Sequence, residues 1–264
     1  MKNLSIGISP CPNDVFIFAG MILGEVTLDG YSLSVDYQDV ETLNHNTEQV
    51  QYDIAKISYA NLSYVSERYT LLDSGGALGR GVGPLLLTGG AKFDPECEIL
   101  VPGERTTANF LLGFYLDRPI KRRYLPFDEV YAAMLQNREA QGVVIHEKRF
   151  TYAQDGLHLV TDLGDHWEKK TGCPIPLGGI VLKKSLEIDP TLLEEKIRES
   201  IRWAEAHDAE TFALCREYAQ DMDENVIRAH IGLYVNEFSL SLGEEGQRAV
   251  SILRERMAAL QSST

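Results

Sequence analysis

Long hydrophobic runs are missing from this sequence. No window approaches the apolar length that spans a bilayer, which argues against a protein built around membrane helices. The first apolar segment, Leu4–Ile8, is too short for the hydrophobic region of a secretory signal peptide, and no small-residue cleavage site accompanies it. We therefore expect a cytoplasmic protein that has no membrane partner.

Paired cysteines are also missing. The four cysteines stand far apart, at positions 11, 97, 173 and 215, and none belongs to a C-x-x-C pair. Two disulfides in an exported protein would account for four thiols, but a reduced cytoplasmic protein is the simpler interpretation. The cysteines and histidines lack the close spacing of a zinc site, so we expect no metal.

Positive charge is scarce. The chain has 25 Lys and Arg against 39 Asp and Glu, a formal net charge of −14, which argues against a nucleic-acid partner or an anionic membrane surface. Helix N-termini and a few cationic side chains can still bind a small anion locally. At 264 residues, with 44% hydrophobic and 24% charged residues, the chain has the composition of a globular protein with room for two lobes.

The chain contains no glycine loop of the P-loop type. Its glycine-rich segment, residues 73–84, has no lysine, whereas a P-loop needs lysine and a hydroxyl residue directly after the glycines. The segment is either a flexible connector or a loop whose backbone passes close to a ligand or another strand.

Strand and helix patterns alternate along the first third of the chain. Leu4–Ile8 and Tyr31–Gln38 have strand patterns, and Val15–Glu25 between them has a helical one. This rhythm predicts an α/β fold with a parallel sheet. A second series of strands and helices follows the glycine-rich segment, and amphipathic helices extend from Pro190 to Leu260.

Two crossings between the series predict two lobes with a ligand cleft between them. The expected hinges lie near Thr88–Lys92 and Pro174–Gly179. Residues 1–89 and 178–264 then form a larger lobe, and residues 90–177 form a smaller one. Within the second lobe, Gly164–Pro176 is expected to be irregular.

The segment Ser9-Pro10-Cys11-Pro12-Asn13-Asp14 turns the first predicted strand into the first predicted helix. Open α/β sheets bind ligands at such corners, beyond the carboxyl ends of their strands. Two prolines fix two φ angles and remove two backbone donors, so the corner is costly unless its geometry is used. Asn13 and Asp14 are N-cap residue types that can also reach a ligand, and a capped turn without a ligand is the alternative.

His146 is the strongest candidate for proton transfer. It ends the apolar strand pattern Gly142–Ile145, where open α/β sheets place functional groups. Imidazole is the side chain best suited to move protons near neutral pH. The alternative is a partly exposed histidine that only caps the strand.

Two strand-to-helix junctions offer groups that bind anions. One is Thr106-Thr107, and the other is Lys56-Ile57-Ser58. Hydroxyl groups and the free N–H groups of a first helical turn can bind a carboxylate or phosphate, although simple N-capping is the commoner outcome for such threonines. With Ser58 and Thr107 facing each other across the cleft, the site would suit a small acidic substrate.

Asn44 and Arg80 are two further candidates for substrate binding. Asn44 lies in a predicted helix of the first lobe, and Arg80 lies in the glycine-rich segment. An arginine can pair bidentately with a carboxylate, although a surface arginine is the commoner case.

Several of these motifs, in the same order, resemble the family of 1,4-dihydroxy-6-naphthoate synthases of the futalosine route to menaquinone. They are residues 9–14, Lys56-Ile57-Ser58, residues 77–85, Thr106-Thr107-Ala108 and Ile145-His146-Glu147. The resemblance covers roughly the first two thirds of the chain. Val82 departs from it, because many relatives have a cysteine or another small residue there.

The resemblance implies a type II periplasmic-binding-protein-like fold that serves an enzyme in the cytoplasm. It implies a carbon–carbon lyase that converts cyclic dehypoxanthine futalosine to 1,4-dihydroxy-6-naphthoate without a cofactor. The family's catalytic base falls on His146. Its substrate contacts fall on Lys56, Ile57, Ser58, Thr107 and Ala108. Thr106 is a further candidate for substrate binding from its position before the helix, and we expect Asp14 and Asn44 to hold sugar hydroxyls.

Two other functions remain open on the sequence. Chorismate dehydratase belongs to the same pathway and shares the fold, and a small-anion-binding protein without catalysis would share the cleft. The residue 9–14 corner and His146 favour the naphthoate synthase, and the missing export signal argues against a binding protein.

Overall fold

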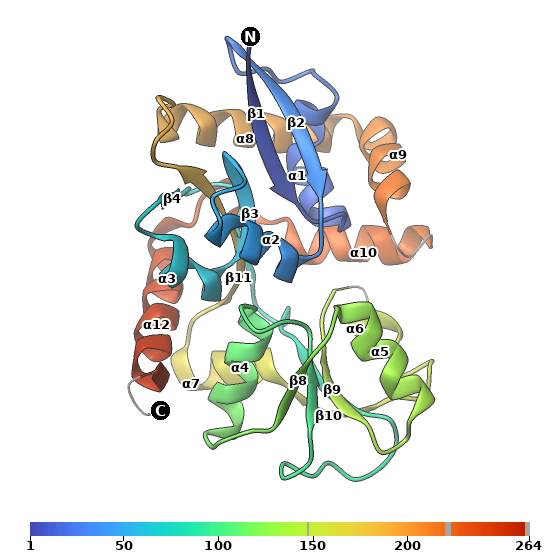
Figure 1. The fold of residues 1–264 in the computed structure, drawn as a ribbon. Coiled ribbons are helices and arrows are strands. Elements are labelled where there is room, and N and C mark those ends of the chain that lie inside the picture. The colour runs from blue at the N-terminus through green and yellow to red at the C-terminus, as the bar shows by residue number, and fades with distance from the viewer. Residues whose placement is uncertain (147, 220–222, 262–264) are drawn as a thin grey trace.

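Two β-sheets, one above the other, organise the chain (Figure 1). This computed structural model describes residues 1–146, 148–219 and 223–261. The first sheet contains β1 (Lys2–Ile8), β2 (Tyr31–Tyr37), β3 (Ile54–Ser58), β4 (Tyr69–Leu71), β5 (Ala77–Gly79) and β11 (Ile175–Lys183). The second contains β6 (Leu85–Thr88), β7 (Ile99–Val101), β8 (Arg122–Tyr124), β9 (Gln141–Val144) and β10 (His158–Asp162). The expected two-lobed α/β architecture is confirmed.

The first sheet is mixed, whereas the alternation of strand and helix patterns predicted a parallel sheet. Strands β2 and β3 both pair parallel to β1, in the order β2-β1-β3. The long strand β11 then pairs antiparallel to β3, β4 and β5. Because β11 returns from the second lobe, no crossover helix constrains its direction, and the βαβ pattern of the early sequence could not reveal it.

Helices cover the first sheet on both sides. They are α1 (Pro12–Ile22), α2 (Val40–Glu48), the 3-10 turn η1 (Tyr59–Asn61), α3 (Leu62–Val65), α8 (Pro190–Ala206), α9 (Asp208–Tyr218), α10 (Glu224–Tyr234), α11 (Glu237–Leu240) and α12 (Gly243–Gln261). Phe18 of α1 packs with Ile197 and Ile201 of α8 in one apolar core. This packing holds the N-terminus of α1 at the edge that faces the second lobe (Figure 1).

The second lobe carries α4 (Thr107–Leu116), α5 (Phe127–Gln136), α6 (Lys148–Thr151) and α7 (Leu163–Thr171). The expectation that Gly164–Pro176 is irregular was wrong. Asp162 caps α7 by accepting hydrogen bonds from the backbone N–H groups of Gly164 and Asp165. Trp167 is fully buried against Phe110 and Phe114 of α4, so tertiary packing stabilises a helix whose sequence is mostly polar.

Sheet membership shows where the chain passes between the lobes. Strand β6 begins at Leu85 in the second sheet, and β11 begins at Ile175 in the first. The first passage therefore lies a few residues before the expected hinge near Thr88–Lys92, and the second lies at the start of the expected hinge near Pro174–Gly179. The lobe boundaries at 89/90 and 177/178 stay a prediction. No disulfide joins the four cysteines, and within the described parts of the chain no helix is long and apolar enough to cross a membrane.

Candidate active site

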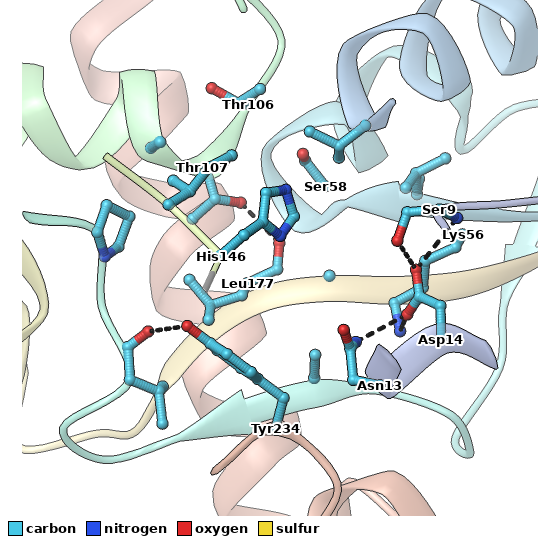
Figure 2. Close-up of a pocket in the computed structure, with 18 of the residues that line it drawn as sticks. Ser9, Asn13, Asp14, Lys56, Ser58, Thr106, Thr107, His146, Leu177 and Tyr234 are labelled. Carbon is cyan, nitrogen blue, oxygen red and sulfur yellow. Dashed lines mark hydrogen bonds and ion pairs between the residues drawn. The ribbon is translucent and has the colours of Figure 1, made fainter. Parts of the chain in front are cut away.

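A cavity of about 110 Å³ lies between the lobes (Figure 2). It is lined by strands of the first sheet, by the start of α4 and the segment after β9 in the second lobe, and by α10. Of the candidate residues selected from the sequence, nine line it: Asn13, Asp14, Lys56, Ile57, Ser58, Thr106, Thr107, Ala108 and His146. Tertiary structure thus brings together groups that lie up to 132 positions apart, from Asp14 to His146, in the chain. Asn44 and Arg80 are not among the lining residues.

The corner of residues 9–14 is held by a buried ion pair between Asp14 and Lys56. Lys56 Nζ lies 2.8 Å from Asp14 Oδ1, and both side chains are less than a tenth exposed. Ser9 Oγ donates to Asp14 Oδ2 over 2.7 Å, and Asn13 Nδ2 donates to Oδ1 over 2.9 Å (Figure 2). These donors occupy the Asp14 carboxylate, so it positions its neighbours and is poorly placed to hold sugar hydroxyls.

Asn44 supports the cavity indirectly, through hydrogen bonds to Ser58. Its Oδ1 accepts from the backbone N–H of Ser58 over 2.9 Å, and its Nδ2 donates to Ser58 Oγ over 3.2 Å. Asn44 is fully buried and is not among the residues that line the cavity, and its expected contact with substrate stays a prediction. Because Ser58 Oγ accepts from Asn44, its own hydrogen remains available for a ligand in the cavity.

The two threonines use their hydroxyls inside the protein. Thr106 caps α4, since its Oγ1 accepts from the N–H of Asn109 and donates to the carbonyl of Gly103. Thr107 Oγ1 donates to the Leu177 carbonyl over 3.0 Å and accepts from the Ala60 N–H over 3.3 Å. The groups left to bind an anion at this helix start are the first backbone N–H groups, which have no acceptor within the helix.

His146 lies two residues beyond the end of β9, in the short segment before α6. Its φ of 59° lies in the left-handed region, a conformation that costs a non-glycine residue on the order of 1 kcal/mol and is concentrated at functional sites. Its ring lies edge-on to Phe127, with centroids 4.8 Å apart. Its Nδ1 is 3.3 Å from Sγ of Cys11, so the second-lobe histidine touches the first-lobe corner. Glu147, which completes the motif, lies outside the described residues.

Two residues of α10 complete the cavity, and the sequence reasoning missed both. His230 is 1% exposed, and its Nε2 lies 2.8 Å from Asn13 Oδ1. Burial, with a smaller contribution from nearby His146, lowers the pKa of His230 to about 3. Tyr234 donates its hydroxyl to the carbonyl of Val82 over 3.4 Å. The signal for both was their spacing of one helical turn, which places them on the same face of α10.

Arg80 lies at the surface instead of in the cavity. It donates to the carbonyl of Gly172 and forms an ion pair with Glu245 at 2.7 Å, with its side chain half exposed. The part of the glycine-rich segment that lines the cavity is Val82-Gly83-Pro84. A Cβ on Gly83 would lie 2.4 Å from Cα of Gly164, so this backbone passes close to another segment, as one of the two interpretations of the glycines expected.

The two histidines and the aspartate among the described residues that line the cavity are not arranged as a metal site. No group of three or more His, Cys, Asp or Glu residues among residues 1–146, 148–219 and 223–261 is arranged to hold a metal ion. The chemical groups that the cavity offers are two imidazoles, a helix start, a serine hydroxyl and a buried lysine that is paired with a carboxylate.

Residues 4–259 match the family described as "Menaquinone biosynthesis". The chain belongs to this family. Two curated relatives cover nearly all of it, and both are named 1,4-dihydroxy-6-naphthoate synthase. The relative from Thermus thermophilus is 44% identical over 257 residues, which are 96% of this chain and 93% of the relative. The relative from Streptomyces coelicolor is 41% identical over 265 residues, which are 97% and 93% of the two chains.

Solved structures agree with the fold. A protein of Archaeoglobus fulgidus that is 28% identical superposes with a TM-score of 0.91 and covers 99% of this chain and 98% of its own. The periplasmic aliphatic sulphonate binding protein of Escherichia coli, 10% identical, covers 100% of this chain and 88% of its own with a TM-score of 0.67. The periplasmic-binding-protein-like fold is confirmed, here in an enzyme family of menaquinone biosynthesis.

Proposed function

We propose that this protein is a 1,4-dihydroxy-6-naphthoate synthase, a cytoplasmic carbon–carbon lyase that acts on cyclic dehypoxanthine futalosine. The names of the two relatives support the activity. The observation that carries the assignment to this site is His146, a strained strand-end histidine in the cavity that contacts Cys11 of the opposite lobe. A base held at that position can act on a ligand enclosed by both lobes.

The proposed reaction is a redox-neutral cleavage. His146 removes the proton of a hydroxyl in the sugar-derived part of the substrate. The C–C bond to the bicyclic part breaks as that oxygen becomes a carbonyl, and the electron pair of the bond passes into the bicyclic system. That system regains a proton and becomes aromatic, which drives the reaction. The protein must supply a base, an anion clamp and exclusion of water, and no cofactor takes part.

The anion clamp in this proposal joins the start of α4 to Ser58. The first backbone N–H groups of α4, those of Thr107 and Ala108, have no acceptor within the helix, and Ser58 has a hydroxyl hydrogen to donate. Thr107, Ala108 and Ser58 all line the cavity. We assign the substrate carboxylate to this place, which leaves the sugar-derived part toward His146.

The test is an assay of purified protein with cyclic dehypoxanthine futalosine. The wild type should release the naphthoate and a small sugar-derived fragment, and His146→Ala should lower kcat by about 100-fold or more, the usual contribution of a general base. His158→Gln changes an exposed histidine on β10 and serves as the matched control. Undiminished release by His146→Ala would remove His146 from the mechanism, and a wild type that dehydrates chorismate instead would replace the proposed function.

A further inference from the structure

His230 has one ring nitrogen in use and one without a partner. Its Nε2 lies 2.8 Å from Asn13 Oδ1. Its Nδ1 is buried and has no hydrogen-bond partner among the residues that the structure describes. The ring lines the cavity between the lobes, where a ligand would meet it. The sequence offers no assignment for this histidine, and the reaction described above does not use it.

A chain of hydrogen bonds determines which nitrogen carries the proton. The Asp14 carboxylate, paired with Lys56, can only accept, so the side-chain nitrogen of Asn13 must face it, as the 2.9 Å contact has it. The amide oxygen of Asn13 therefore faces His230. Because an amide oxygen can only accept, Nε2 of His230 must donate to it, and Nδ1 of the neutral ring is then an acceptor.

The ring remains neutral, which keeps Nδ1 an acceptor. Burial lowers the pKa of His230 to about 3, so the ring is unprotonated across the physiological range. A ring that resists protonation so strongly is a poor general base. His230 can therefore receive a hydrogen bond from a ligand but is not suited to remove a proton.

The position of the ring indicates which part of a ligand it meets. The imidazoles of His230 and His146 lie nearly parallel, with centroids 6.3 Å apart and planes inclined by 17°. This separation is too large for direct stacking of the two rings but lets one ligand group, or two adjacent groups, reach both. The region of the cavity next to the proposed base is therefore also next to a fixed acceptor.

We propose that Nδ1 of His230 accepts a hydrogen bond from a hydroxyl in the sugar-derived part of the substrate and so positions it against His146. The relay Lys56–Asp14–Asn13 maintains the tautomer that makes this possible. The assignment rests on the proposed function, since it takes a polyhydroxylated substrate at this site. In this proposal the buried ion pair between Asp14 and Lys56 fixes the orientation of the Asn13 amide, which is two hydrogen bonds away from the ligand.

Two variants separate this role from a structural one. His230→Gln keeps an amide N–H near the place of Nε2, and thus the bond to Asn13, but removes the acceptor. His230→Asn puts an amide oxygen near the place of Nδ1 and loses the bond to Asn13. We expect His230→Gln to lower kcat/KM by about tenfold or more, and His230→Asn to retain the larger share of activity. A purely structural histidine would give the reverse order and would overturn the proposal.

Binding measurements separate the proposed role of His230 from the proposed function of the protein. The product naphthoate has no sugar-derived part, so its Kd should be the same for wild type, His230→Gln and His230→Asn. In the His146→Ala background, which retains the substrate, His230→Gln should weaken binding of cyclic dehypoxanthine futalosine by about tenfold. If the His230→Gln change leaves the substrate affinity of His146→Ala unchanged while the wild type is fully active, only the role of His230 is overturned. A wild type that does not turn over this substrate would overturn the proposed function and this assignment with it.

A spectroscopic measurement covers the case in which the His230 variants do not fold. In His146→Ala protein labelled with ¹⁵N-histidine, Nε2 of His230 should carry the proton and Nδ1 should not. Addition of the cyclic substrate should shift the Nδ1 resonance, whereas addition of the naphthoate should leave it unchanged. A protonated Nδ1, or a resonance indifferent to the substrate, would contradict the proposal.

Discussion

At the scale of single residues, His146 and His230 show how the surroundings of a side chain decide its chemistry. Both imidazoles border one cavity, yet His146 is partly exposed on a strained backbone and His230 is 1% exposed on a helix. The sequence predicts His146 as a functional residue because it ends an apolar strand pattern, where open α/β sheets place functional groups. His230 had no such signal, because the fate of a histidine within a helix depends on what packs around it.

The buried neutral ring of His230 predicts a pH-dependent stability. Its pKa of about 3 lies below the value of 6.5 for an unfolded histidine, so the unfolded chain binds the proton first as the pH falls. The contribution of the neutral ring is complete above about pH 6.5 and is lost as the pH falls toward 3. Within that window one such group lowers the free energy of unfolding by about 1.4 kcal/mol per pH unit.

Urea unfolding between about pH 5 and about pH 7 would measure this slope. His230→Gln should reduce the pH dependence relative to wild type, and His158→Gln, at an exposed position, should leave it as it is. Identical slopes for wild type and His230→Gln would mean that the folded protein protonates His230 readily.

At the scale of elements, the site is made of strand-to-helix junctions, and these are the parts that the sequence predicts best. The strands expected at residues 4–8 and 31–38 agree with β1 and β2 to within about two residues, and the strand-to-helix junction expected at Thr106-Thr107 is the start of α4. In contrast, α7 was missed, because its polar sequence is helical only through its cap at Asp162 and the packing of Trp167. Each junction needs support from a neighbouring element, as Asn44 of α2 supports Ser58.

The variant Asn44→Ala should therefore weaken the strand-to-helix junction at Ser58 without removing a residue that lines the cavity. The variant removes both hydrogen bonds to Ser58, and we expect a rise in KM of about tenfold with a smaller change in kcat, because the anion clamp loosens while His146 is unaffected. Asn46→Ala is the control, since Asn46 lies on the same helix but bonds Tyr52 instead. An unchanged KM in Asn44→Ala would show that the Ser58 junction does not depend on Asn44.

At the scale of the whole molecule, contacts between the lobes enclose the cavity. The Glu41 carboxylate of α2 accepts from the backbone N–H groups of Glu104 and Arg105 in the second lobe, and Arg105 pairs with Glu48 over 3.1 Å. Gly103 has a φ of +106°, and a Cβ there would lie 2.6 Å from the Glu41 carboxyl group. This glycine lets the carboxylate reach the backbone of the other lobe.

Glu41→Ala should favour a more open arrangement of the lobes. Loss of these hydrogen bonds should lower kcat/KM by about tenfold, because the reaction needs water excluded, while the free energy of unfolding should change by only about 1 kcal/mol. Small-angle scattering would detect the expected increase in the radius of gyration, and Glu67→Ala, at an exposed position, provides the control. A radius and activity equal to those of Glu67→Ala would show that Glu41 does not hold the lobes together.

The sequence by itself determined the α/β class, the two lobes, and the residues that end strands or begin helices, because hydrophobic periodicity and capping chemistry act locally along the chain. It also contained the motifs of the family. Only the tertiary structure decided how those groups are used. The Asp14 carboxylate is occupied by three side-chain donors, and Asn44 lies behind Ser58. Arg80 lies at the surface, and His230 of a distant helix lies next to His146. Burial and hydrogen-bond partners depend on segments far apart in the chain, and no local pattern encodes them.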